Sequence, residues 1–207
     1  MSYKPLQRDV YIVPVNGAVT PAYAPAIKAV LDQLYAPAQV SWNVTIKANI
    51  QVDNITADGF STTGLALASR YTDDMNKVIK AWKKANNLPA KTVVLFFSKG
   101  QQQRQAWLWL YNYGFIFNLS SNLELLVYEL GHGTFNLKHT FSDKAFGRGS
   151  GKAPVFAEKT TQNLMDYVNG TELWKYQWDL IHDPETVWLN FLQGEEEGAG
   201  GKPNRVN

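Results

Sequence analysis

Apolar residues along the chain recur with the spacings of strands that alternate with helices. Runs of β-branched and aromatic residues predict buried strands at 9–15, 40–46 and 92–97. Between them, apolar residues spaced three and four apart predict amphipathic helices at 24–34 and 71–86. This alternation predicts an α/β domain, or an α+β domain, in which helices back a mixed, twisted sheet.

The second half of the chain continues this order and adds one strongly apolar helix. Residues 106–119 are rich in aromatic side chains and predict an edge strand or a hairpin. The apolar run from Leu123 to Phe135 follows serine and asparagine residues that suit an N-cap, so it predicts a buried helix. A further helix is predicted near 171–181, and the apolar residues after it suggest another that ends at Leu192.

Length and composition predict one globular domain with a short tail. The chain has 207 residues, of which 45% are hydrophobic, and this is enough to bury a substantial core. We assign residues 1–193 to a single domain. Residues 194–207 are charged and rich in glycine, so they predict a flexible tail.

Charge and cysteine content narrow the classes of partner and metal site. The net charge is only +2, so no electrostatic argument favours a nucleic-acid partner. The chain has no cysteine, which excludes disulfides and limits metal ligands to histidine, aspartate, glutamate or tyrosine.

The sequence also bears on localisation. No apolar run approaches the length of a membrane-spanning helix, so we expect no membrane span. The N-terminus lacks the hydrophobic segment of a signal peptide. We therefore expect either an exported protein without its leader or a domain that is delivered as part of a larger secreted chain, and the compartment stays open.

The candidate chemistry lies on the apolar helix, at residues 128–132. The sequence there is Tyr-Glu-Leu-Gly-His, which would read H-E-x-x-H, a zinc-binding signature, if position 128 held histidine. Residues four apart share one face of a helix, so two histidines at this spacing can bind one zinc ion. The intervening glutamate then lies beside the metal-bound water and can act as a general base. In this chain Glu129 and His132 are present, and Tyr128 stands where the first ligand would be.

Two downstream features extend the pattern: His139, and the segment Asn163-Leu164-Met165-Asp166-Tyr167. With them the chain resembles the metzincin group of zinc peptidases, whose pattern is H-E-x-x-H-x-x-G-x-x-H followed by a Met-turn. The resemblance implies an active-site helix, a Met-turn and a C-terminal helix. It implies these roles: Glu129 as general base, His132 and His139 as second and third zinc ligands, Met165 beneath the zinc, and Tyr167 near the metal or the oxyanion.

The chain departs from the metzincin pattern at three points. Tyr128 replaces the first ligand, His139 lies one residue late, and Phe135 replaces the glycine that turns the chain toward the metal. Asn136 can adopt a left-handed conformation and turn the chain instead. Asp143, Glu158 and His182 are the alternatives for the third ligand. His182 also suits the end of a helix, because Pro184 follows and cations favour helix C-termini.

These departures lead to geometric expectations. The helix should end between Gly133 and Asn136, and His139 should return to ligand-pair distance from His132. Met165 should lie beneath the two histidines, and Tyr128 should point into the same space. Glu129 should face a cleft, because an unpaired buried carboxylate is costly. The alternative readings make Met165 an ordinary core residue and Tyr167 an ordinary packed tyrosine.

The function implied by the resemblance is that of a zinc-dependent endopeptidase acting on a protein or peptide substrate. A phenol binds zinc well only after losing a proton with a pKa of about 10, so we expect weak or absent zinc binding and impaired activity. One interpretation is that Tyr128 is an inactivating substitution in an otherwise active enzyme. The presence of Glu129, His132 and His139 favours this interpretation. The alternative is a natural pseudopeptidase that binds peptides or proteins. A toxin or effector domain with a cognate inhibitor, or immunity protein, would also suit a chain without its own leader.

Overall fold

The computed structural model describes most of the predicted domain. The described residues are 3–17, 23–53, 55, 71–89, 91–98, 106–109, 112–117, 123–142, 155–167 and 170–182. The predicted tail at 194–207 and the predicted helix up to Leu192 lie outside them.

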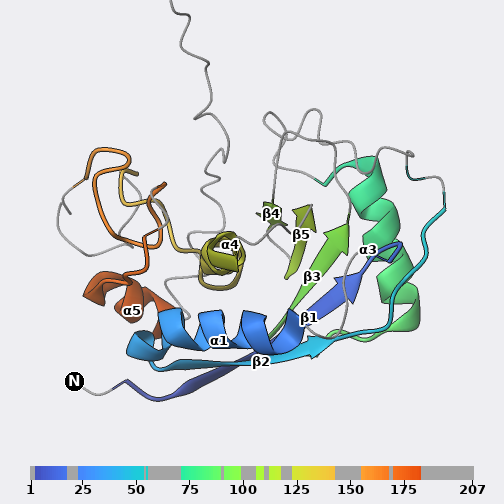
Figure 1. Cartoon of the computed structure of the whole chain (residues 1–207), viewed down its shortest axis with the longest axis horizontal. Helices are drawn as coiled ribbons and strands as arrows, with labels where there is room; N and C mark the ends of the chain where they lie inside the picture. The colour runs from blue at the N-terminus through green and yellow to red at the C-terminus, as the bar shows by residue number, and fades with distance from the viewer. Residues whose placement is uncertain are drawn as a thin grey trace, which may run out of the picture.

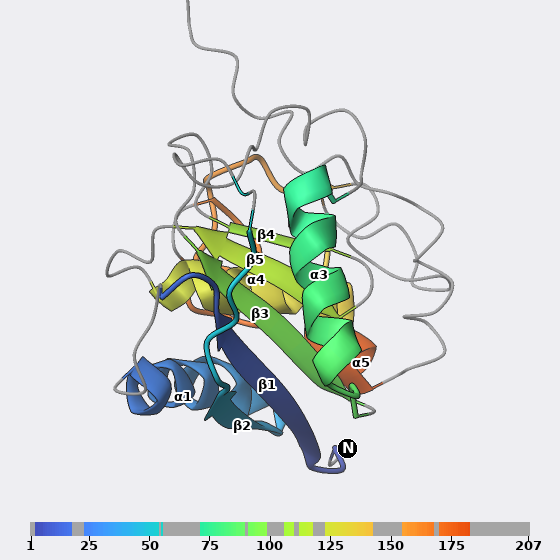
Figure 2. The same cartoon turned by 90° about the vertical axis from the view of Figure 1, so that its right-hand side faces the viewer.

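A five-stranded sheet forms the centre of the protein, in the order β2-β1-β3-β5-β4 (Figures 1 and 2). Its strands are β1 (Leu6–Pro14), β2 (Val40–Ile46), β3 (Thr92–Ser98), β4 (Ala106–Trp109) and β5 (Tyr113–Phe117). The pairs β1–β2, β1–β3 and β3–β5 are parallel, whereas β4 pairs antiparallel with β5 at one edge. The architecture is therefore mixed α/β.

Helices cover both faces of this sheet, as Figure 2 shows. They are α1 (Tyr23–Tyr35), α3 (Asp73–Ala85), α4 (Leu123–Phe135) and α5 (Lys175–His182), with a short 3-10 turn at Ala36–Ala38. Helices α1 and α4 pack on one face and α3 packs on the other.

Strand β3 shows why the sheet needs helices on both faces. All seven of its residues are buried, and successive side chains of a strand point to opposite faces. Val93, Leu95 and Phe97 pack with the residues of α1 and α4. Val94 and Phe96 pack instead with Met75, Val78, Ile79 and Trp82 of α3, the four residues that helical spacing places on its inner face.

The strand and helix predictions for the first half of the chain are confirmed to within a few residues. The aromatic segment at 106–119 forms a hairpin, in which β4 is the sheet edge and β5 is internal. Helix α5 begins at Lys175 rather than near 171, because Glu172 is held in a β-bridge with Asn163. In the described part of the chain, no helix is long and apolar enough to cross a membrane.

Candidate active site

Helix α4 carries the candidate catalytic residues along one face of the sheet. Leu126, Val127 and Leu130 are buried in the core below it. The helix ends at Phe135, and Asn136 follows with a φ of 51°. This left-handed residue reverses the chain, so the predicted end of the helix and the predicted turn at Asn136 are both confirmed.

The reversal brings His139 back to His132. Their rings have centroids 4.8 Å apart and meet edge to face. His139 therefore returns to contact His132, as expected, whereas the ligand-pair distance between their nitrogens stays a prediction; we call His132 and His139 the histidine pair. His132 Nδ1 lies 2.6 Å from the carbonyl oxygen of Leu137. A carbonyl only accepts hydrogen bonds, so Nδ1 carries the proton and Nε2 carries the lone pair.

Tyr128 points into the same space, as predicted. Its ring centroid lies 4.6 Å from that of His132, and its hydroxyl oxygen lies 2.6 Å from His139 Nε2. The phenol is the more acidic group of this pair, so its O–H donates to the imidazole nitrogen. The tyrosine thus occupies the nitrogen that His139 would offer to a metal.

Burial controls the charge of His132. The Nε2 atom of His132 is buried, and desolvation lowers the pKa of His132 to about 3, with the positive charge of Lys138 acting in the same direction. The hydrogen bond to Leu137 opposes this shift. His132 is therefore a neutral imidazole at physiological pH, which is the form that binds metals.

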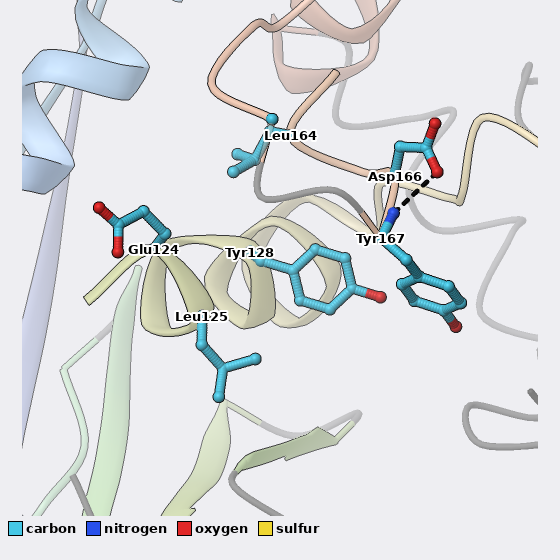
Figure 3. A pocket seen from close by; sticks show the side chains of 7 residues that line it. Glu124, Leu125, Tyr128, Leu164, Asp166 and Tyr167 are labelled. Carbon is cyan, nitrogen blue, oxygen red and sulfur yellow. Dashed lines mark hydrogen bonds between the residues drawn. The ribbon is translucent and has the colours of Figure 1, made fainter. Parts of the chain in front are cut away.

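Glu129 differs from our expectation. It lies one helical turn after Leu125, which points from α4 toward the strands in Figure 3, and α4 contacts β4 and β5. Only 6% of Glu129 is exposed, so its carboxylate is enclosed by the protein rather than open to a cleft. The sequence predicts that Glu129 follows Tyr128 on the helix. It does not predict how closely the sheet packs against the side of α4 that carries Glu129.

Met165 lies against both segments that carry the histidine pair. A side chain at Gly131 would place its Cβ 2.9 Å from Met165 Sδ, so the methionine packs where this glycine leaves room. The Met165 carbonyl accepts a hydrogen bond from the backbone amide of Thr140, the residue after His139. This contact pattern agrees with the predicted position of Met165 beneath the pair, and the residue is also fully buried.

Tyr167 borders the histidine pair from the exposed side. Its ring centroid lies 5.0 Å from that of His139, and 37% of the residue is exposed. Phe141 stacks on His139, with centroids 4.7 Å apart, and its ring centroid also lies 5.1 Å from that of Tyr167. Sequence reasoning missed Phe141, because its position relative to His139 depends on the turn that follows the helix.

A hydrogen-bonded network holds the segment that carries Met165 and Tyr167. Asn163 and Gln177 are both fully buried and exchange two hydrogen bonds through their side-chain amides, at 2.8 and 2.9 Å. Asn163 Oδ1 also accepts the Met165 amide, and Gln177 Oε1 accepts the Trp174 amide. Nearby, Asp166 accepts from the backbone amides of Lys159, Thr160, Thr161 and Tyr167, and from the Thr161 hydroxyl. We call Asn163, Asp166 and Gln177 the support network.

The charge of Asp166 is set by two opposing effects. Burial raises its pKa, but the hydrogen bonds from Thr161, Lys159 and Tyr167 outweigh this effect and hold the pKa below its ordinary value. The sequence signal for the support network was weak: Asp166 and Asn163 flank Met165, but nothing in the sequence identifies Gln177 as a partner.

A hollow of about 130 Å³ lies beside Tyr128, between the start of α4 and the Met165 segment (Figure 3). It is lined by Glu124, Leu125, Tyr128, Leu164, Asp166, Tyr167 and Gly170. Tyr128 and Tyr167 project side by side at one end of it in Figure 3. Tyr128 therefore lines this hollow and also contacts both histidines.

The alternative third ligands lie elsewhere or outside the described residues. His182 ends α5, where its Nε2 lies 2.6 Å from the Ala38 carbonyl oxygen and its ring stacks on Tyr3. Glu158 pairs with Lys159 at the surface. Asp143 is not among the described residues. Of the candidates that can be placed, His139 is the one beside His132.

The donor set does not fit a metzincin-type zinc centre. Catalytic zinc takes three protein ligands from histidine, cysteine or carboxylate side chains. Within the described ranges, no group of three such residues could hold a metal ion. The histidine pair supplies two imidazoles, and the third group that faces them is the protonated phenol of Tyr128.

Comparisons with known proteins add little to this picture. No family model matches the chain, and no curated protein matches it. A solved structure described as "Structure of a chaperone-substrate complex" is similar with a TM-score of 0.46 and 12% sequence identity. The match covers 94% of this chain but only 35% of that one, so this chain corresponds to about a third of its length.

Proposed function

We propose that this chain has the framework of a zinc-dependent endopeptidase of the metzincin kind, and that Tyr128 blocks its catalytic site. One observation carries the proposal: Tyr128, His132 and His139 contact one another beside the segment that carries Met165. His132 and His139 are seven residues apart in the sequence, and the turn at Asn136 brings their rings into contact.

The block follows from the hydrogen bond between Tyr128 and His139. A zinc ion would have to break this bond and remove a proton from a phenol whose ordinary pKa is about 10. A histidine at position 128 removes both obstacles, because imidazole binds zinc as a neutral group. The proposed substrate is a protein or peptide. The edge strand β4 supports this class, because an extended peptide can add to an exposed sheet edge.

The Tyr128→His variant tests the proposal directly. We expect it to bind one zinc ion per chain and to cleave a protein substrate in a chelator-sensitive reaction, whereas the chain with Tyr128 does neither. Adding Glu129→Ala should abolish cleavage but leave zinc bound, because Glu129 would supply the base and not a ligand. His182→Gln is the matched histidine control and should change neither property, since His182 packs on Tyr3 and Ala38. Zinc binding by Tyr128→His without cleavage of any peptide in a broad library would contradict the endopeptidase proposal.

A second candidate function is a pseudopeptidase that binds a peptide or protein segment without metal. The favouring observation is again the Tyr128–His139 hydrogen bond, because it joins the two segments of the site without an ion. The test measures binding of an extended peptide in the presence of chelator. Equal binding by the chain with Tyr128 and by its Glu129→Ala variant would favour this function over the first. The proposed toxin or effector role, and the inhibitor it requires, stay predictions.

A further inference from the structure

We propose that Lys28 and Asp32 of α1 close the exposed edge of strand β2, and that without them two copies of this chain pair through β2. The inference concerns the β2 side of the sheet, so it depends on neither of the proposed functions. It begins from the sheet order, in which β2 and β4 are the two edge strands in the described part of the chain. An edge strand presents unpaired backbone N–H and C=O groups that can pair with another chain.

The two edges differ in how well they can pair with another chain. Strand β4 spans only four residues, and a very short edge strand is itself a protection against pairing. Strand β2 spans seven residues, Val-Ser-Trp-Asn-Val-Thr-Ile, without a charge, a proline or a glycine. Charged residues and prolines are the usual protection that a long edge strand carries. Any protection of β2 therefore comes from outside the strand.

Backbone hydrogen bonds show which residues of β2 face away from the sheet. The Gln39 carbonyl accepts from the Leu6 amide, and the Lys47 amide donates to the Ile12 carbonyl, so both ends of this segment face β1 at odd-numbered residues. The backbone groups of successive strand residues point to alternate sides, and the even-numbered residues therefore face outward. We call these four residues the outward row: Val40, Trp42, Val44 and Ile46.

Lys28 and Asp32 occupy the outward row at Trp42. Lys28 Nζ donates to the Trp42 carbonyl oxygen over 3.0 Å, and the Trp42 amide donates to Asp32 Oδ1 over 3.2 Å. The two side chains lie four residues apart on α1 and also form an ion pair with each other. A neighbouring strand would offer Trp42 the same donor and the same acceptor. The pair therefore takes the place of a strand at this position and excludes a real one.

Removing the pair should open the edge without dislodging β2. The Trp42 side chain is fully buried, and its ring centroid lies 5.4 Å from that of Tyr35 and 5.9 Å from that of Phe135. Strand β2 also pairs with β1 along its whole length. The opened outward row is the same in every copy and carries no charge that would repel its like. Two copies can then exchange backbone hydrogen bonds across a twofold axis, so the partner is a second copy of this chain.

The test measures the mass of the full chain in solution by analytical ultracentrifugation over a range of concentrations. We expect wild type to remain monomeric, because its edge is closed. Lys28→Ala with Asp32→Ala should dimerise, so that its mass approaches about twice that of wild type at high concentration. Lys175→Ala with Asp179→Ala is the matched control, because it removes the same two residue types at the same spacing from α5, and it should remain monomeric.

A further variant tests whether the dimer contact lies on β2. Thr45 is an exposed residue of this strand, and lysine on an edge strand opposes edge-to-edge pairing. Thr45→Lys, added to Lys28→Ala with Asp32→Ala, should therefore return the chain to a monomer. A dimer that survives Thr45→Lys would overturn the proposal, because its contact would lie elsewhere.

Three other results would also overturn the proposal: a double variant of Lys28 and Asp32 that stays monomeric, a control that dimerises, or a wild type that dimerises as strongly as the double variant. Circular dichroism checks that each variant folds. Should the double variant fold poorly, Lys28→Ala alone serves instead, because it frees the Trp42 carbonyl and leaves the hydrogen bond to Asp32 in place. This variant should dimerise more than wild type, and a monomer at every concentration would contradict the closed edge.

Discussion

The two sides of the candidate site are held together in different ways. On the α4 side, the helix is joined to the segment that follows it by hydrogen bonds of the candidate site residues themselves, from Tyr128 to His139 and from His132 to the Leu137 carbonyl. On the other side, the support network holds the Met165 segment with multiple hydrogen bonds, several of them buried. The α4 side is therefore held by the same side chains that would carry the chemistry, whereas the other side is held by residues outside the histidine pair.

This difference separates the structural support of the site from its chemistry. The support network positions Met165 and Tyr167 whether or not a metal is bound, because none of its hydrogen bonds uses the histidine pair. A single substitution at position 128 can then change the chemistry without dismantling the support. The expected effects of mutation on stability should differ accordingly between the two sides.

The largest effect is expected for Asn163→Ala. The substitution leaves the Gln177 amide nitrogen and the Met165 backbone amide without their acceptor in a fully buried location. Each unsatisfied buried group costs about 1–3 kcal/mol, so the free energy of unfolding should fall by about 3 kcal/mol. Urea unfolding measures this loss. Asn43→Ala is the control, because it removes only an exposed hydrogen bond to Asp9; an equal loss in both variants would contradict the importance of the buried pair.

Asp166→Asn should have the second largest effect and a distinct pH signature. The amide keeps the shape and one acceptor oxygen but loses the charge, so the free energy of unfolding should fall by about 2 kcal/mol, the contribution of about one hydrogen bond to a charged group. The pKa of Asp166 is lowered from 3.8 in the folded protein. Its contribution is therefore complete above the unfolded value and is lost as the pH falls through 3.8 toward the folded pKa.

The measurement is urea unfolding of wild type and Asp166→Asn across the acid range. The two stabilities should differ most above the unfolded pKa and converge in stronger acid. A gap that stays constant down to the lowest pH would show that the carboxylate charge of Asp166 does not stabilise this segment.

Helix positions and strand positions were predictable because they follow local periodicity. The apolar residues of α3 and β3 repeat at helical and strand spacings. The apolar face of α3 packs on one face of the sheet, and the two faces of β3 pack in two separate clusters of buried residues. The turn at Asn136 and the return of His139 were also predictable, since both follow from residues close in sequence. The Tyr128 contact with His139 needed only that turn and the helical position of the tyrosine.

The features that were missed depend on contacts between distant segments. Nothing near Gln177 indicates that its amide will meet Asn163, and the late start of α5 follows from the bridge between Asn163 and Glu172. The burial of Glu129 depends on how closely α4 approaches the hairpin of β4 and β5. Such distances are set by packing of the whole domain and leave no local pattern.

The smallest effect on stability is expected for Tyr128→Phe. It removes one half-buried hydrogen bond and keeps the aromatic ring, so the loss should be about 0.5–1.5 kcal/mol. Thermal unfolding should show a decrease of only a few degrees, about 2–4 °C per kcal/mol for a chain of this size. A loss as large as that of Asn163→Ala would contradict the contrast drawn between the two sides of the site.

The position of β1 has a consequence for synthesis of the protein. This strand precedes the other four strands of the sheet in the sequence, yet it lies inside the sheet, and both of its neighbours come later: Leu6 lies opposite Val40 and Asp9 opposite Thr92. As the chain leaves the ribosome, β1 gains its partner β2 early but keeps its other edge unpaired until β3 has emerged. A nascent chain that stops before β3 therefore exposes a backbone edge that invites aggregation. The candidate site can assemble only after that edge is closed, because α4 rests on strands that are added beyond β3.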